Sequence, residues 1–105
     1  NNYSIHKLFS YLFYLYYFIM DIENLNNNIK TKLLKYSFIQ NVKIEDKTYL
    51  HVKHSSHDKN KFHIKLIVYS DKLKNISKLD ATKKIYKILD DEITNYIHSI
   101  QILFE

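Results

Sequence analysis

The chain has 105 residues, a formal net charge of +5, and no glycine, proline or cysteine. A chain of this length forms a single domain with one modest core. Without cysteine it can form no disulfide, offer no thiolate to a metal and use no cysteine nucleophile, and cysteine usage gives no indication of its compartment. The positive charge comes from lysine and favours acidic partners, but it is also ordinary for a small soluble domain.

The first twenty residues differ from the rest, because residues 8–20 are almost all apolar or aromatic. This run is shorter than the roughly 20 residues of a transmembrane helix, and no small-residue cleavage site follows it. We expect residues 1–19 to be a leader or extension outside the fold and residues 20–105 to form the domain. Alternatively, the run packs on the fold or contacts a membrane. A start at Met20 would favour the cytoplasm, and a targeting leader would imply an organelle.

Apolar residues at helical spacing predict a helix over residues 21–36. They are Ile22, Leu25, Ile29, Leu33 and Leu34. Asp21 is the expected N-cap, because its carboxylate can accept a hydrogen bond from an amide of the first turn. Residues 26–28 are asparagines, which are poor helix formers, so this helix must depend on tertiary packing.

Two or three strands and a polar loop are predicted next. Val42 and Ile44 mark a first strand, and residues 49–52 extend it or form another. Residues 54–61 are a polar hairpin loop, longer than a tight turn and of a size that often carries function. Residues 64–69 are almost continuously apolar and β-branched, as expected of a central, well-buried strand.

The last third of the chain predicts a turn, a helix and a strand. Asn75 can adopt the left-handed conformation in the turn, and residues 74–79 can add a helical turn. Apolar residues on one face predict a helix over residues 79–93. In a final strand over residues 96–104, alternation places His98 with Ile100, Ile102 and Phe104 on one side, and Ser99 with Gln101 on the other. The fold predicted is α+β, in the order α-β-β-α-(α)-β, with helices on one face of a three-stranded sheet.

Histidine is the residue type that most suggests a site. His51, His54, His57 and His63 surround the hairpin, and His98 opens the last strand. Neutral imidazole is a good metal ligand and can replace cysteine at a [2Fe–2S] iron. Two ligands from one chain cannot complete a cluster, so a partner would have to supply the others. The structural alternative is that His98 is a half-buried hydrogen-bonding residue and the loop histidines are solvated.

Five short motifs follow one another in fixed order. They are Tyr69-Ser70, Leu73-Lys74-Asn75, Ala81-Thr82-Lys83, Leu89-Asp90-Asp91-Glu92-Ile93 and Ile97-His98-Ser99. The sequence resembles the BolA-like family, whose pattern is Val-Ser, F-x-G, Arg-His-Arg, Leu-x-x-Glu-Leu and Ile-His-Ala. Upstream, residues 42–48 are similar to the family's first strand, which ends in Asp-x-Ser/Thr. The resemblance covers roughly the last four-fifths of the chain.

The resemblance implies a topology similar to a type II KH domain and a non-enzymatic adaptor that is monomeric alone. BolA-like proteins pair with a monothiol glutaredoxin and share a [2Fe–2S] cluster, to which the glutaredoxin contributes its cysteine and a glutathione thiol. The family's terminal-motif histidine corresponds to His98. Its loop ligand falls best on His51, with His54 and His57 as rivals, and His63 matches a position that looks structural. The role implied is iron–sulfur maturation or iron sensing, with no membrane partner for the folded domain.

One departure from the family concerns the head of the main helix. The family's Arg-His-Arg is replaced by Ala81-Thr82-Lys83, so only the second basic residue is approximated. Thr82 cannot bind iron as a histidine does, which puts the geometry of the partner interface in doubt.

Nucleic-acid binding is the alternative function. Lys83, Lys84 and Lys87 on the predicted helix could contact phosphates, and some bacterial BolA-like proteins act as transcription regulators. Against this, the chain has no G-x-x-G loop, which a KH domain needs to clamp a nucleic-acid backbone. Catalysis is disfavoured, because residues 90–92 point in different directions on a helix and no nucleophile elbow, P-loop or H-E-x-x-H motif is present.

Overall fold

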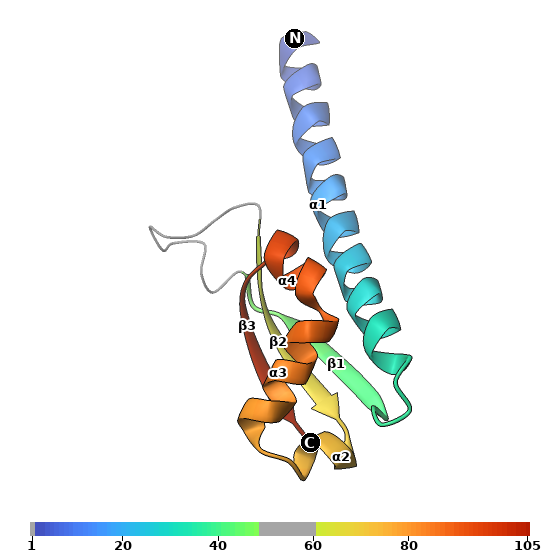
Figure 1. The fold of residues 1–105 in the computed structure, drawn as a ribbon. Coiled ribbons are helices and arrows are strands. Elements are labelled where there is room, and N and C mark those ends of the chain that lie inside the picture. The colour runs from blue at the N-terminus through green and yellow to red at the C-terminus, as the bar shows by residue number, and fades with distance from the viewer. Residues whose placement is uncertain (1, 49–60) are drawn as a thin grey trace.

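The computed structural model describes residues 2–48 and 61–105, with the backbone alone for residues 2, 3, 14 and 16–21. Its elements are α1 (Asn2–Leu34), β1 (Asn41–Asp46), β2 (Phe62–Tyr69), α2 (Asp71–Lys74), α3 (Lys78–Ile88), α4 (Asp90–Tyr96) and β3 (Ile97–Phe104), as Figure 1 shows. The predicted α+β class is confirmed. The predicted hairpin loop and the segment 49–52 lie almost wholly outside the described residues.

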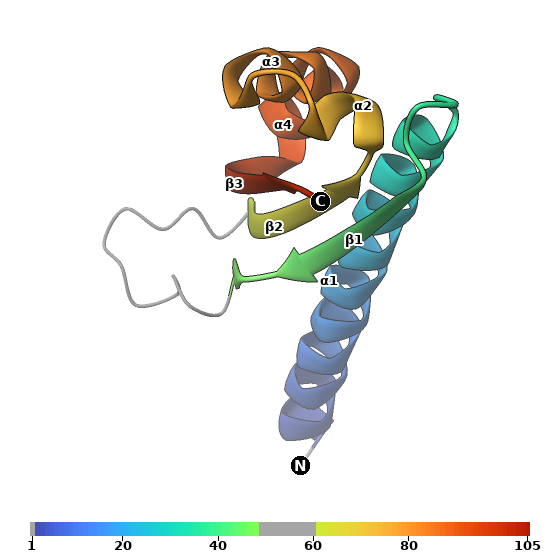
Figure 2. The same cartoon turned by 90° about the horizontal axis from the view of Figure 1, so that it is seen from below.

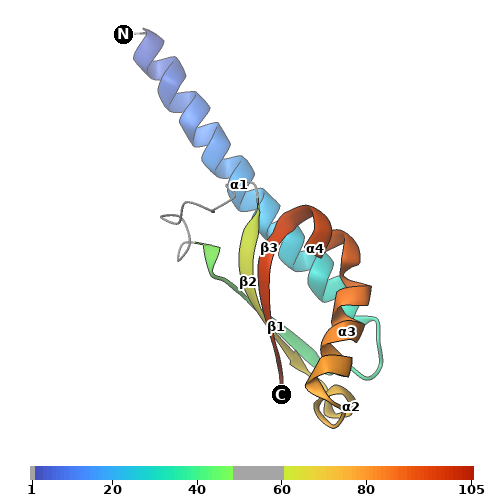
Figure 3. The ribbon, with the colours of Figure 1, turned by 60° about the vertical axis from the view of Figure 1, so that its left-hand side comes forward.

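The three strands form a mixed sheet in the order β1-β2-β3. β1 runs antiparallel to β2, with Val42 opposite Val68, and β3 runs parallel to β2, with Ile102 opposite Leu66. Figure 2 shows α1 alongside β1, and α3 and α4 over β2 and β3. Helices therefore cover one face of the sheet, as predicted, and Figure 3 shows the strands on one side of the domain and the helices on the other.

One hydrophobic core joins the helices to the covered face of the sheet. The second half of α1 contributes Ile29 and Leu33, and α3 contributes Ile85, all fully buried. Leu66 from β2 is fully buried among them. Burying one such side chain contributes about 1.5–3 kcal/mol, so this core is the main source of the domain's stability.

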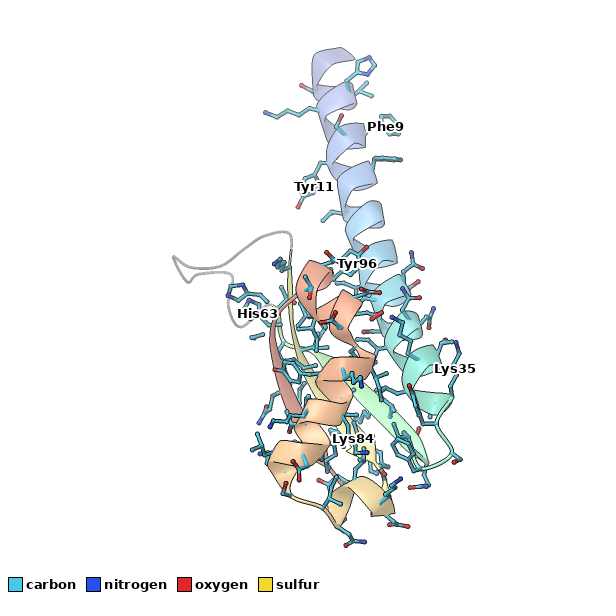
Figure 4. All side chains as sticks on the ribbon, in the orientation of Figure 1. Phe9, Tyr11, Lys35, His63, Lys84 and Tyr96 are labelled. Atoms are coloured by element: carbon cyan, nitrogen blue, oxygen red, sulfur yellow. The ribbon has the colours of Figure 1, made fainter. Side chains whose placement is uncertain are left out.

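The first helix is longer than predicted. It begins at Asn2 rather than after Asp21, and Figure 1 shows its first half extending beyond the rest of the domain. The prediction of an N-cap at Asp21 is wrong, because no glycine or proline separates the apolar run from the amphipathic half. The exposed fraction of Phe9 is 66% and that of Tyr11 is 60%, and both rings point away from the helix (Figure 4). Whether residues 1–19 stand outside the working domain stays a prediction.

None of the described helices combines the length and the apolar character that crossing a membrane requires.

The helix predicted over residues 79–93 is divided into α3 and α4. The backbone leaves helical geometry at Leu89, where φ is −100° and ψ is 22°. Asp90, Asp91 and Glu92 then occupy the first turn of α4, where carboxylates interact favourably with the helix dipole. The acidic cluster therefore marks the start of a second helix.

A short helix precedes α3, but earlier than predicted. It is α2, whose N-cap Ser70 accepts a hydrogen bond from the backbone N–H of Leu73 at 3.1 Å. Asn75 ends α2 with φ −91° and ψ −4°, so it is right-handed and the left-handed prediction is wrong. A second serine cap starts α3, where Ser77 accepts from the N–H of Asp80 at 3.1 Å.

An ion pair holds α1 against α4. The Nζ of Lys32 lies 2.5 Å from Oε1 of Glu92, whose side chain is 5% exposed, and donates a hydrogen bond to Oε2 at 3.0 Å. The hydrogen bond with Glu92 raises the pKa of Lys32 above its ordinary value. Glu92 is thus a structural residue.

Candidate metal-ligand site around His98

The site begins with a β-bulge in the parallel pairing of β2 and β3. Phe62 is opposite Ile97, but His63 is opposite Ser99, so His98 is an extra residue on β3. A bulge redirects the side chain that it carries, and such bulges are common beside functional sites. Ile97 is buried, whereas His98 is exposed. The bulge therefore presents the imidazole of His98 at the surface.

The bulge changes the face on which His98 was predicted to lie. Ile100 and Ile102 do lie opposite Ile64 and Leu66 of the core, as the alternation predicts. His98 does not share their face, because simple alternation fails at an inserted residue. Its ring contacts His63, which lies between the core residues Phe62 and Ile64 along β2.

His63 contacts both His98 and Ser99 at this end of the sheet. Its ring centroid lies 4.9 Å from that of His98, with 56° between the ring planes. His63 is only 4% exposed and stands near the start of β2 (Figure 4). Its Nδ1 lies 2.7 Å from the hydroxyl oxygen of Ser99, within hydrogen-bond distance. The interpretation from sequence left His63 out of the ligand set because it matches a family position that looks structural. Its ring contact with His98 depends on a bulge that the sequence pattern does not reveal.

The backbone of His63 is held by the end of β1. Its N–H donates to Oγ1 of Thr48 at 3.1 Å, and its carbonyl accepts from the N–H of Lys47 at 2.7 Å. Thr48 is held in turn by Asp46, whose Oδ1 accepts from the Thr48 N–H at 3.0 Å and from the Thr48 hydroxyl at 2.5 Å. The Asp-x-Thr motif therefore has a structural purpose, which is to anchor His63.

A shallow hollow of about 370 Å³ opens beside these residues. Its lining combines basic, polar and aliphatic side chains: Lys47, His63, Ile64, Lys65, Ser99, Ile100 and Gln101. The Oε2 of Glu45 lies 3.3 Å from the Nζ of the lining residue Lys47. The hydrogen bond with Lys47 lowers the pKa of Glu45 below its ordinary value.

The predicted ligand set is only partly within the described residues. His98 is described, whereas His51, His54 and His57 lie in the segment 49–60 outside the description, so the loop ligand stays a prediction. In residues 2–48 and 61–105, no group of three or more histidine, cysteine, aspartate or glutamate side chains could hold a metal ion. An exposed imidazole such as that of His98 is chemically suited to be one donor to a [2Fe–2S] iron.

The lysines of the alternative function lie on a different element. Lys83, Lys84 and Lys87 are exposed on α3, and Lys84 is labelled there in Figure 4. Exposed aspartates stand near both ends of this helix, at Asp80 and Asp90. At the helix head, Ala81 is fully buried and Thr82 is half-buried. The structure places this group on a different element from the histidine pair.

These features define a small α+β domain whose exposed histidine stands on a bulged last strand. The sequence model of the BolA-like protein family matches residues 34–104, and the chain belongs to that family. No match was found among curated protein sequences.

Several solved structures are similar to this chain, among them the following three. The BolA domain of SufE1 from Arabidopsis thaliana is 28% identical, with a TM-score of 0.60, and the match covers 74% of this chain and 86% of that one. BolA1 from Arabidopsis thaliana is 20% identical, with a TM-score of 0.61 and coverages of 75% and 87%. A Bol-like protein from Babesia bovis is 13% identical, with a TM-score of 0.53 and coverages of 72% and 77%. The last two show the fold alone.

Proposed function

We propose that this protein is a non-enzymatic adaptor that pairs with a monothiol glutaredoxin and helps bind or transfer a [2Fe–2S] cluster. Membership of the BolA-like family supports this function. The observation that carries it is the exposure of His98 on the β-bulge at the end of the sheet. An imidazole presented in this way can reach an iron that another molecule holds.

Each partner contributes a different kind of ligand in this proposal. The glutaredoxin cysteine and a glutathione thiol supply both thiolates, which suits a chain without cysteine. His98 supplies one imidazole, and His51 supplies the other, with His54 and His57 as rivals. Alone, the chain is a monomer that holds no cluster.

The hollow beside His63 and Ser99 offers a place where anionic groups of the partner can bind. Glutathione carries carboxylates, and the lysines at positions 47 and 65 line the hollow beside His63 and Ser99. Charges of opposite sign accelerate the encounter of two proteins and help to fix their register. Lys47 is paired with Glu45, so Lys65 is the lining lysine in this hollow that supports an anionic partner group most directly.

The test is a titration of the full chain into cluster-loaded monothiol glutaredoxin with glutathione, followed by visible absorption and circular dichroism. We expect a new spectrum for the wild type and for His6→Ala, which alters an exposed histidine on the projecting part of α1. His98→Ala should leave the far-ultraviolet spectrum of the free chain intact and abolish or change the new visible spectrum. An unfolded His98→Ala variant, or a visible spectrum identical to the wild type, would contradict the proposal.

A further inference from the structure

We propose that His63 and Ser99 are positioning residues that fix the imidazole of His98 in one orientation for metal binding. This inference rests on the proposed function for the part that concerns metal. The observation behind it is local to the sheet: a bulge, a ring contact and a hydrogen bond meet at three side chains from two strands.

A histidine on a bulge needs such support. His98 is exposed and has no residue opposite it on β2, because its neighbours Ile97 and Ser99 take the two successive positions in the register. An exposed side chain loses rotamer freedom when it binds, which weakens binding unless the chain has already ordered it. The ring of His63 lies against one side of the His98 ring and restricts its movement.

His63 can act as a fixed surface because it is itself held on several sides. It is 4% exposed, and its N–H and carbonyl are both bonded to the end of β1. Its ring is then oriented by Ser99 through the 2.7 Å contact between Nδ1 and the hydroxyl oxygen. Because its backbone and its ring are both held in this way, the ring of His63 offers the His98 ring a surface that moves little.

Ser99 links this fixed ring to the bulge. It directly follows His98 in β3, so the hydrogen bond between Ser99 and His63 ties the backbone beside His98 to β2. Breaking this bond leaves the strand pairing and the ring contact in place but frees the His63 ring to turn, so the His98 ring packs against a less fixed surface. Residues outside the ligand set that orient a ligand typically change metal affinity by about 10- to 100-fold.

The test uses Ser99→Ala, with Ser99→Thr as the conservative variant and Ser10→Ala as the matched control. Ser10 is exposed on α1, away from the hollow and the histidine pair. Two quantities are measured on the full chain: the order of the His98 ring by side-chain NMR relaxation in the free protein, and the affinity for cluster-loaded monothiol glutaredoxin with glutathione. We expect Ser99→Ala to lower the ring order and to weaken binding by about 10- to 100-fold. Ser99→Thr and Ser10→Ala should match the wild type in both.

A second variant tests the role of His63 without removing a ring from the core. His63→Phe keeps an aromatic ring beside His98 but cannot bond to the Ser99 hydroxyl. It should match Ser99→Ala in both quantities, and a wild-type result would overturn the role of His63. An unchanged His98 ring order in Ser99→Ala, or an equal loss in Ser10→Ala, would overturn the proposal as a whole. If the wild type binds no cluster, the proposed function fails, and the ring order in the free protein still decides whether His63 and Ser99 position His98.

Discussion

The anchoring of His63 predicts a measurable cost when the hydroxyl of Thr48 is removed. Thr48 is 7% exposed, and its hydroxyl oxygen accepts from the His63 N–H at 3.1 Å while its proton is donated to Asp46. Thr48→Val keeps the shape of the side chain and removes both bonds. Leaving a buried donor without its acceptor costs about 1–3 kcal/mol, so the free energy of unfolding should fall by that amount. For a domain of this size, each kcal/mol lowers the midpoint of thermal unfolding by about 4–8 °C.

Urea unfolding followed by far-ultraviolet circular dichroism measures this cost. Thr94→Val is the matched control, because Thr94 is exposed on α4, and it should change the free energy of unfolding by no more than about 0.5 kcal/mol. Equal stability of Thr48→Val and the wild type would refute the reasoning, since the end of β1 would then not anchor His63.

Two further predictions concern the ion pair and the core. Lys32→Met leaves the buried Glu92 carboxylate without its cation, so the midpoint of thermal unfolding at neutral pH should fall, whereas Lys30→Met at an exposed position should not lower it. Since the pKa of Lys32 is raised in the folded state, its contribution is complete below the ordinary value of 10.5 and is lost as the pH rises above it. The difference between wild type and Lys32→Met should therefore shrink in strongly alkaline solution, and a constant difference would contradict this cause. Leu89→Ala, at a fully buried position, should lower the free energy of unfolding by about 2–5 kcal/mol in chemical denaturation. Leu79→Ala, at a position that is 64% exposed, should change it little, and equal losses would contradict the core described above.

The fold was predictable where the side-chain pattern is strong. The apolar run of β2 identifies a central strand, because that strand is flanked on both edges and covered on one face. The spacing of Ile29, Leu33 and Ile85 identifies the buried faces of α1 and α3. The order of the motifs identified the family, which the match over residues 34–104 confirms.

Helix boundaries were less predictable, because several residues are compatible with both a helix interior and a helix end. Asp21 has the chemistry of an N-cap, yet the preceding residues are helix-compatible and the helix continues through it. The apolar face from Ile85 to Ile93 has one period, and only the backbone angles at Leu89 show that two helices share it. Local propensity alone does not distinguish these outcomes.

The candidate site was predictable in its main residue but not in its support. The motif predicted His98 as a ligand, and that role stays a prediction, whereas the orientation of His98 depends on the bulge between β2 and β3. The contact with His63 joins residues 35 positions apart, and no periodic pattern within either strand indicates it. Ser99 directly follows the bulge, and its contact with His63 can be recognised only when the register of β2 and β3 is known.

The claim that His98 binds the cluster can be tested at the iron itself. The full chain is labelled with ¹⁵N-histidine, combined with cluster-loaded monothiol glutaredoxin and glutathione, reduced, and examined by pulsed electron paramagnetic resonance. We predict a hyperfine coupling to histidine nitrogen that weakens or disappears in His98→Ala and persists in His6→Ala. A coupling that is unchanged in His98→Ala, or the absence of any coupling to labelled nitrogen in the wild-type complex, would contradict the role of His98 as a ligand.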